Sequence, residues 1–135
     1  TLGGERQDNA VTAPDWTLCR DQQLPWFLER GERDLWRLSV PQTAPVLDLP
    51  EPPLIEWHGA QRWVRAAAGE AQRLRDAAAA VGGGATLFIA DGAHVERAEG
   101  RFDPLKPPLD RIHRQLKKEF DPAGIFNRGR LYPDF

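Results

Sequence analysis

The chain has 135 residues, which fits one small domain and leaves little room for two compact cores. With 41% hydrophobic and 28% charged residues, its composition is ordinary for soluble globular proteins and argues against global disorder. The net charge of −2 is too small to indicate a nucleic acid or an anionic membrane as partner. The single cysteine, Cys19, excludes an internal disulfide and a cysteine-built zinc site, and it favours a reducing compartment.

The beginning of the chain has the character of a linker. Residues 1–14 are polar and show little periodicity, so we expect a linker or the remnant of a preceding unit. The sequence contains no methionine, which indicates a piece of a longer translation product. Residues 15–23 fit a short helix with Trp16 and Cys19 on one face, stopped by Pro25.

A strand and an extended connector follow. Residues 34–41 alternate between apolar and polar side chains, which predicts a half-buried strand with one apolar face made by Trp36, Leu38 and Val40. Five of the 12 prolines occur between residues 41 and 53. This density excludes a central strand or a long helix there and predicts a connector that lies along the surface.

The next segment predicts a hairpin. Residues 54–58 and 61–65 are β-prone runs on either side of Gly59 and Ala60, which we interpret as a two-residue turn. Trp57 and Trp63 flank this turn and are expected to pair across the strands on one face, inside the core.

The second half predicts two helices and one more strand. An alanine-rich apolar stripe between residues 67 and 81 favours a helix that ends at residues 82–84, three consecutive glycines. Residues 86–90 fit a strand, residues 91–108 a loop, and residues 109–120 a final helix with an apolar stripe. The order predicts an α+β fold, a largely antiparallel sheet with helices on one face in the manner of half a ferredoxin-like unit, followed by an ordered tail that is not helical.

Most of the residues that could take part in catalysis or ligand binding are better explained by structural roles. His58, His94 and His113 have no short-range partner, so no metal ligand is assigned, although His58 lies where it could face a partner surface. The glycines at 82–84 follow a helix, whereas a phosphate-binding loop precedes one. Cys19 has no nearby base. No catalytic residue is assigned.

The tail differs from an ordinary flexible terminus. Residues 120–135 combine turn formers with six large apolar side chains, which indicates a segment without regular structure that is pinned against a surface. Residues 120–130, which read FDPAGIFNRGR, resemble the closing segment of the FAD-linked oxidases of the vanillyl-alcohol-oxidase type, with Arg128 where proline is usual. Residues 35–41, 56–63 and 83–88 resemble one branch of that family, the smaller flavin-type subunits of bacterial glycolate oxidases.

The resemblance implies a heteromeric, FAD-dependent oxidoreductase that oxidises glycolate to glyoxylate and passes electrons through flavin and iron–sulphur subunits. Its implied partners are another flavin subunit and an iron–sulphur subunit, and its implied location is cytoplasmic, at the inner membrane only through the complex. Residues 15–120 would form the C-terminal cap domain on the substrate side, and residues 121–135 a closing tail that docks on the flavin domain. The family's flavin-binding region is N-terminal and outside this chain, so the fragment alone is expected to be inactive.

The same resemblance suggests where the tail meets the flavin domain. Asn127, Arg130 and Tyr132 are expected to face that domain as cofactor-side residues. Asn127 and Gly129 can adopt positive φ and present Arg130 for forked hydrogen bonds to a carboxylate or phosphate. The alternative is a non-catalytic assembly module that binds the other oxidase subunits, and flavin in the full-length protein would distinguish the two.

Overall fold

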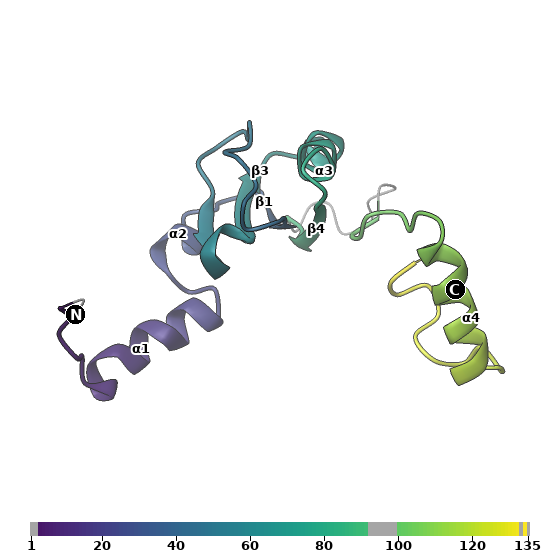
Figure 1. Ribbon diagram of the computed structural model, residues 1–135, viewed down its shortest axis with the longest axis horizontal. Helices are drawn as coiled ribbons and strands as arrows, with labels where there is room; N and C mark the ends of the chain where they lie inside the picture. Colours follow the sequence, from purple (N-terminus) through teal and green to yellow (C-terminus); the bar gives the residue numbers. More distant parts are fainter. Residues whose placement is uncertain (1–2, 92–99, 133, 135) are drawn as a thin grey trace. The chain divides into compact units, whose positions relative to one another are not determined.

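The computed structural model describes residues 3–91, 100–132 and 134, and the chain divides into two compact units (Figure 1). The first unit is Thr1–Gly31 and the second is Glu32–Phe135. Within the described residues, no helix is both long enough and apolar enough to span a bilayer.

The first unit contains helix α1 (Asn9–Arg20) and the one-turn helix α2 (Pro25–Leu28). Asp8 caps α1 because its side chain accepts a hydrogen bond from the Ala10 amide at 2.7 Å. The predicted helix over residues 15–23 therefore covers only the second half of α1, which runs through Pro14 and begins at the Asp8 cap.

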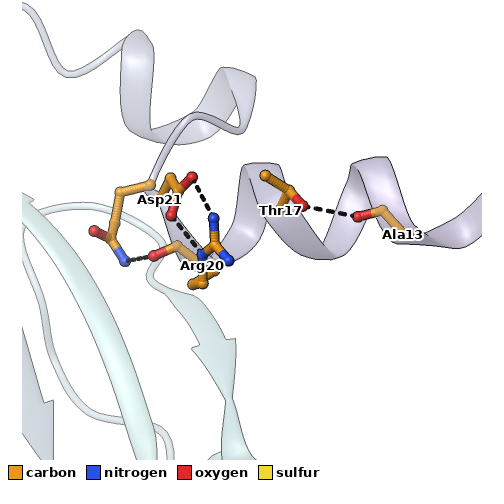
Figure 2. A network of polar contacts seen from close by, with 5 residues as sticks. Ala13, Thr17, Arg20 and Asp21 are labelled. Atoms are coloured by element: carbon orange, nitrogen blue, oxygen red, sulfur yellow. Dashed lines mark hydrogen bonds and ion pairs between the residues drawn. The ribbon is translucent and has the colours of Figure 1, made fainter.

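The end of α1 carries a local network of polar contacts (Figure 2). The Thr17 hydroxyl donates to the Ala13 carbonyl at 3.1 Å, and the Arg20 guanidinium donates twice to the Asp21 carboxylate, at 2.6 and 2.9 Å. This pair is exposed to solvent, so it contributes little to stability. The helix stops before Gln22, whose φ of 53° lies in the left-handed region.

The second unit is built on a four-stranded antiparallel sheet in the order β2-β3-β1-β4. The strands are β1 (Asp34–Ser39), β2 (Leu54–Glu56), β3 (Gln61–Ala66) and β4 (Gly84–Ile89). Helix α3 (Ala71–Ala79) connects β3 to β4, and helix α4 (Leu109–Phe120) follows the sheet. The predicted α+β class is confirmed.

The core lies between one face of the sheet and α3. The apolar face predicted for the first strand is confirmed, because Trp36, Leu38 and Val40 are all buried in one cluster. The prediction that the strand is only half-buried is wrong, since Leu35 on its other face is 1% exposed. Leu74 and Ala78 of α3 complete that cluster, and the small alanine lets the helix lie close on the strands. Leu47 and Leu49 of the proline-rich connector pack against it as well.

The glycines after α3 serve the fold. Gly82 has a φ of +78°, and the Gly83 amide donates to the Ala78 carbonyl at 2.8 Å, which closes the helix end as the sequence predicts. A Cβ at Gly83 would lie 2.3 Å from the Ser39 carbonyl oxygen, so only glycine permits this approach of two backbones.

The hairpin differs from the prediction at Trp57. Strand β2 ends at Glu56, and Trp57–Gly59 form a short 3₁₀ turn, η1, instead of continuing the strand. Trp63 is buried, but Trp57 is 74% exposed, so the expectation that both tryptophans share the core is wrong. The cause is the longer connection, in which Trp57 and His58 both take positive φ and the Trp57 side chain leaves the strand's alternation. Glu56 instead accepts the Trp63 indole N–H at 2.8 Å.

We predict that Trp63→Ala and Trp57→Ala differ sharply in how much they lower the free energy of unfolding. Trp63→Ala should lower the free energy of unfolding by about 3–5 kcal/mol because it empties a buried indole site. Trp57→Ala should change it by less than about 0.5 kcal/mol, since little apolar area is uncovered. Urea denaturation followed by far-UV circular dichroism measures both, and equal losses would contradict the burial described above.

Candidate functional site: the C-terminal helix and tail

Helix α4 is strongly amphipathic, and its apolar stripe is open. Its observed bounds, Leu109–Phe120, coincide with the predicted helix over residues 109–120. The stripe residues lie between 42% and 82% exposed: Leu109, Ile112, Leu116 and Phe120. No residue of α4 is buried. A helix that keeps this much apolar area in water resembles one half of an interface.

Asp121 organises the turn that follows α4. Its carboxylate accepts hydrogen bonds from the amides of Ile125 at 3.0 Å and Phe126 at 2.9 Å. The Lys117 ammonium donates to the same carboxylate at 2.6 Å and also to the Phe126 carbonyl. Gly124, with a φ of +62°, supplies the left-handed residue in this turn, and its amide donates to the Asp121 carbonyl at 2.9 Å.

These contacts explain why Asp, Pro and Gly occur at this spacing. The aspartate is the acceptor for two amides, Pro122 needs no acceptor and has a restricted φ, and Gly124 allows the reversal. The hydrogen bond from Lys117, reinforced by the Phe126 and Ile125 amides, lowers the pKa of Asp121 to about 2.

The tail then returns to α4. Asn127 and Gly129 have φ values of +50° and +66°, as the sequence predicts for a sharp change of direction. The Tyr132 ring stacks on His113 of α4 with centroids 6.4 Å apart, and Asp134 pairs with Arg114 of the same helix. The Arg114 hydrogen bond lowers the pKa of Asp134.

The three predicted site residues have different surroundings. Asn127 and Arg130 are exposed, whereas Tyr132 is half-buried between His113 and Phe102, whose ring centroid is 6.3 Å away. Tyr132 is among the residues that line a cavity of about 550 Å³ beside β4, whereas Asn127 and Arg130 are not. Their orientation toward a flavin domain stays a prediction.

The other residues considered from the sequence are dispersed. His58 is exposed on η1, His113 is half-buried against Tyr132, and Cys19 is half-buried in α1. His94 lies outside the described residues. In the part of the chain that the structure describes, no group of three or more His, Cys, Asp or Glu side chains is arranged to hold a metal ion.

A cavity of about 550 Å³ lies along β4, with Arg37, Arg75 and Asp103 among its lining residues. Two of these charged groups are engaged in the fold. Arg75 pairs with Asp103 at 3.0 Å, and the Asp103 carboxylate also accepts the Ala85 amide at 2.9 Å. The sequence favours a solvated charged loop around Asp103 and does not reveal these contacts, because its partners are 18 and 28 residues away and local spacing does not encode them.

We name the exposed apolar residues of this region the α4–tail surface: Leu109, Ile112, Leu116, Phe120, Ile125, Phe126 and Leu131. The charged residues of this region are mixed in sign. Six are basic and four are acidic: Arg111, Arg114, Lys117, Lys118, Arg128, Arg130, Asp110, Glu119, Asp121 and Asp134. Lys117 pairs with Asp121 and Arg114 with Asp134. Exposed apolar side chains of this kind suit contact with another protein surface.

The fold and this site define a small α+β domain whose C-terminal helix and tail expose apolar side chains. Its sequence is 45% identical over 133 residues, 98% of this chain, to glycolate oxidase subunit GlcE of Escherichia coli (strain K12). The chain spans 34% of the length of that protein. The resemblance to the glycolate oxidase branch noted in the sequence is thereby confirmed. No protein-family model matches the chain, and no solved structure matches it.

We predict that the Asp121 turn is lost in acid. The folded pKa of about 2 lies below the ordinary value of 3.8, so the ionised carboxylate stabilises the turn above that ordinary value. This stabilisation disappears as the pH falls through the folded pKa. Amide hydrogen exchange measured by NMR should show Ile125 and Phe126 losing protection together as the pH is lowered from 6 toward about 1.

Asp121→Asn should weaken the protection of both amides several-fold at neutral pH, because the neutral side chain loses its attraction to Lys117. Glu119→Gln, a charge change at an exposed position of α4, is the matched control and should leave both amides unchanged. Full protection of the two amides in Asp121→Asn would contradict the role assigned to the carboxylate.

Proposed function

We propose that this chain is part of an FAD-dependent oxidoreductase that oxidises glycolate to glyoxylate. The observation that carries the proposal is the 45% identity over nearly the whole chain to a glycolate oxidase subunit. In this proposal the electrons leave through flavin and iron–sulphur subunits, and the partners are the second flavin subunit and the iron–sulphur subunit. The assembly is cytoplasmic and meets the inner membrane only through the complex.

The described residues do not fit a flavin cradle, so the proposal assigns FAD to another part of the full-length protein. The glycine-rich segment after α3 is the only such run in the sequence, and its close backbone contact at Gly83 is with Ser39 of β1. A dinucleotide cradle instead needs free amides ahead of a helix. The chain then supplies the C-terminal part of the substrate-side cap, residues 15–120, and is inactive by itself.

The α4–tail surface is the part of the chain that we assign to contact with the flavin domain. Its apolar residues are exposed, which supports burial against a partner surface. Arg130, exposed next to the left-handed Gly129, is the residue assigned to pair with a carboxylate or phosphate of that domain. Asn127 shapes the turn, and Tyr132 holds the tail against α4.

A second candidate is a non-catalytic assembly module. The observation that favours it is the wide apolar surface of α4 and the tail, together with the dispersed titratable residues in the described part of the chain. In this alternative the subunit binds the other oxidase subunits and takes no part in the chemistry.

Flavin content distinguishes the two candidates. We expect the full-length protein to purify with FAD near one per chain, visible as flavin absorbance, and the present chain to purify colourless. Calorimetric titration of the chain with FAD should give no binding. A colourless full-length protein that still joins the complex would support the assembly module, whereas tight FAD binding by the chain would move the flavin contacts into the cap.

Arg130→Ala tests the role of the tail. In the full-length protein this change should lower flavin retention or the yield of the complex several-fold, because an interfacial guanidinium loses its partner. Arg73→Ala is the matched control, since Arg73 lies on the exposed side of α3 with only long contacts to Glu70 and Asp48, at 3.4 and 3.5 Å. Equal flavin content and equal complex yield for the two variants would mean that the tail only closes its own domain.

A further inference from the structure

Residues 100–103 run along the outer edge of β4, and we call them the β4 strap. The Leu87 amide donates to the Arg101 carbonyl at 2.8 Å, and the Ala85 amide donates to the Asp103 carboxylate at 2.9 Å. Because β4 is an edge strand, these contacts occupy amides that would otherwise be open to another strand. The β4 strap therefore closes this edge of the sheet.

Arg75 of α3 fastens the β4 strap at two points. Its Nη2 donates to the Gly100 carbonyl at 2.8 Å, and its Nε lies 3.0 Å from Asp103 Oδ1 in an ion pair. The Arg75 side chain is 11% exposed, and its guanidinium lies 5.4 Å from the centroid of the buried Trp36 ring. The β4 strap is thus held by a group that itself packs on the core.

The two charges of this ion pair depend on each other. Arg75 Nε and Asp103 Oδ1 are both buried, and neither makes a hydrogen bond among the residues that the structure describes. Removing one charge would therefore leave the other buried and unmatched. Gly84 leaves room for the carboxylate, since a Cβ there would lie 2.8 Å from Asp103 Oδ2.

The β4 strap also contacts the C-terminal tail. The ring of Phe102, within the strap, lies against the ring of Tyr132 with centroids 6.3 Å apart. Tyr132 in turn stacks on His113 of α4. Arg75, Phe102 and Tyr132 all line the cavity of about 550 Å³ beside β4. The fastening of the strap and its contact with the tail therefore lie at one cavity.

We propose that Arg75 is a positioning residue for the C-terminal tail. It fixes Asp103, the adjacent Phe102 is thereby held in place, and Phe102 sets the position of Tyr132 and of the α4–tail surface relative to the sheet. The proposal rests on the proposed function in one respect, that this surface contacts a flavin domain. It adds that α3, which has no residue in that surface, controls where the surface lies.

The first test uses NMR on the chain, because a path of contacts carries coupling only if a change at one end moves the other. Arg75→Gln removes the charge of the guanidinium. We expect faster amide exchange at Ala85 and Leu87 and loss of the nuclear Overhauser effect between the rings of Phe102 and Tyr132. A role limited to the sheet would change the two amides and leave the ring contact intact.

Two further variants make this test specific. Asp103→Asn removes the other charge and nearly keeps the side-chain shape, so it should produce the same changes, and it serves in place of Arg75→Gln if that variant does not fold. Arg73→Gln, on the exposed side of α3, is the matched control and should change neither the amides nor the ring contact. The Ile125 and Phe126 amides should keep their protection in all three variants, because Asp121 holds them independently.

Flavin retention in the full-length protein is the second measurement. We expect Arg75→Gln to lower it several-fold relative to Arg73→Gln, because the α4–tail surface is no longer held in position. If the ring contact is lost in the chain and flavin retention is unchanged, the positioning role of Arg75 stands and the assignment of the surface to a flavin domain is wrong.

Two results would overturn the positioning role. In one, Ala85 and Leu87 lose protection in Arg75→Gln and Asp103→Asn while the contact between Phe102 and Tyr132 persists. In the other, these variants behave as Arg73→Gln does in every NMR measurement.

Discussion

The central position of β1 is the constraint on which the sheet depends. This strand pairs with β3 on one side and with β4 on the other, and Leu35 and Trp36, on opposite faces, are each 1% exposed. A strand buried on both sides and both faces must have all its backbone groups paired, which forces its neighbours into register. The close approach of Gly83 to Ser39 and the α3 cover over Trp36 both follow from that requirement.

Charged side chains make different contacts near the two edges of the sheet. At β4, Asp103 and the Arg101 carbonyl satisfy outward-facing amides, while Arg75 neutralises the Asp103 carboxylate. Next to β2, the buried Arg62 of β3 donates to carbonyls of the connector and of the hairpin turn. The first arrangement seals an edge. The second leaves the side chains of Ile55 and Trp57 exposed.

In the C-terminal region, polar contacts hold the backbone in place while the apolar side chains remain exposed. Hydrogen bonds centred on Asp121 and the pairing of Arg114 with Asp134 fold the tail back along α4. The apolar residues of the same helix and tail take no part in this and stay in water. The local geometry is therefore formed without contacts of the apolar side chains, and the proposed docking would need no refolding of the tail. Pre-organisation of this kind reduces the entropy lost on association.

Local patterns in the sequence were sufficient for several elements. The alternation at Trp36, Leu38 and Val40 predicted β1, the stripe from Leu109 to Phe120 predicted α4, and the glycines predicted the end of α3. Each of these rests on interactions within a few residues or on a repeat that only one secondary structure satisfies. The left-handed conformations of Asn127 and Gly129 could be predicted for the same reason.

By itself the sequence determined the α+β class, most of the elements and the resemblance to a glycolate oxidase subunit. Only the tertiary structure decided that Trp57 is exposed while Trp63 is buried, because β2 ends at Glu56 and Trp57 takes a positive φ outside the strand. It also decided that the α4 stripe is open. Periodicity identifies which face of a helix is apolar, but what covers that face depends on contacts between distant segments, which no local pattern encodes.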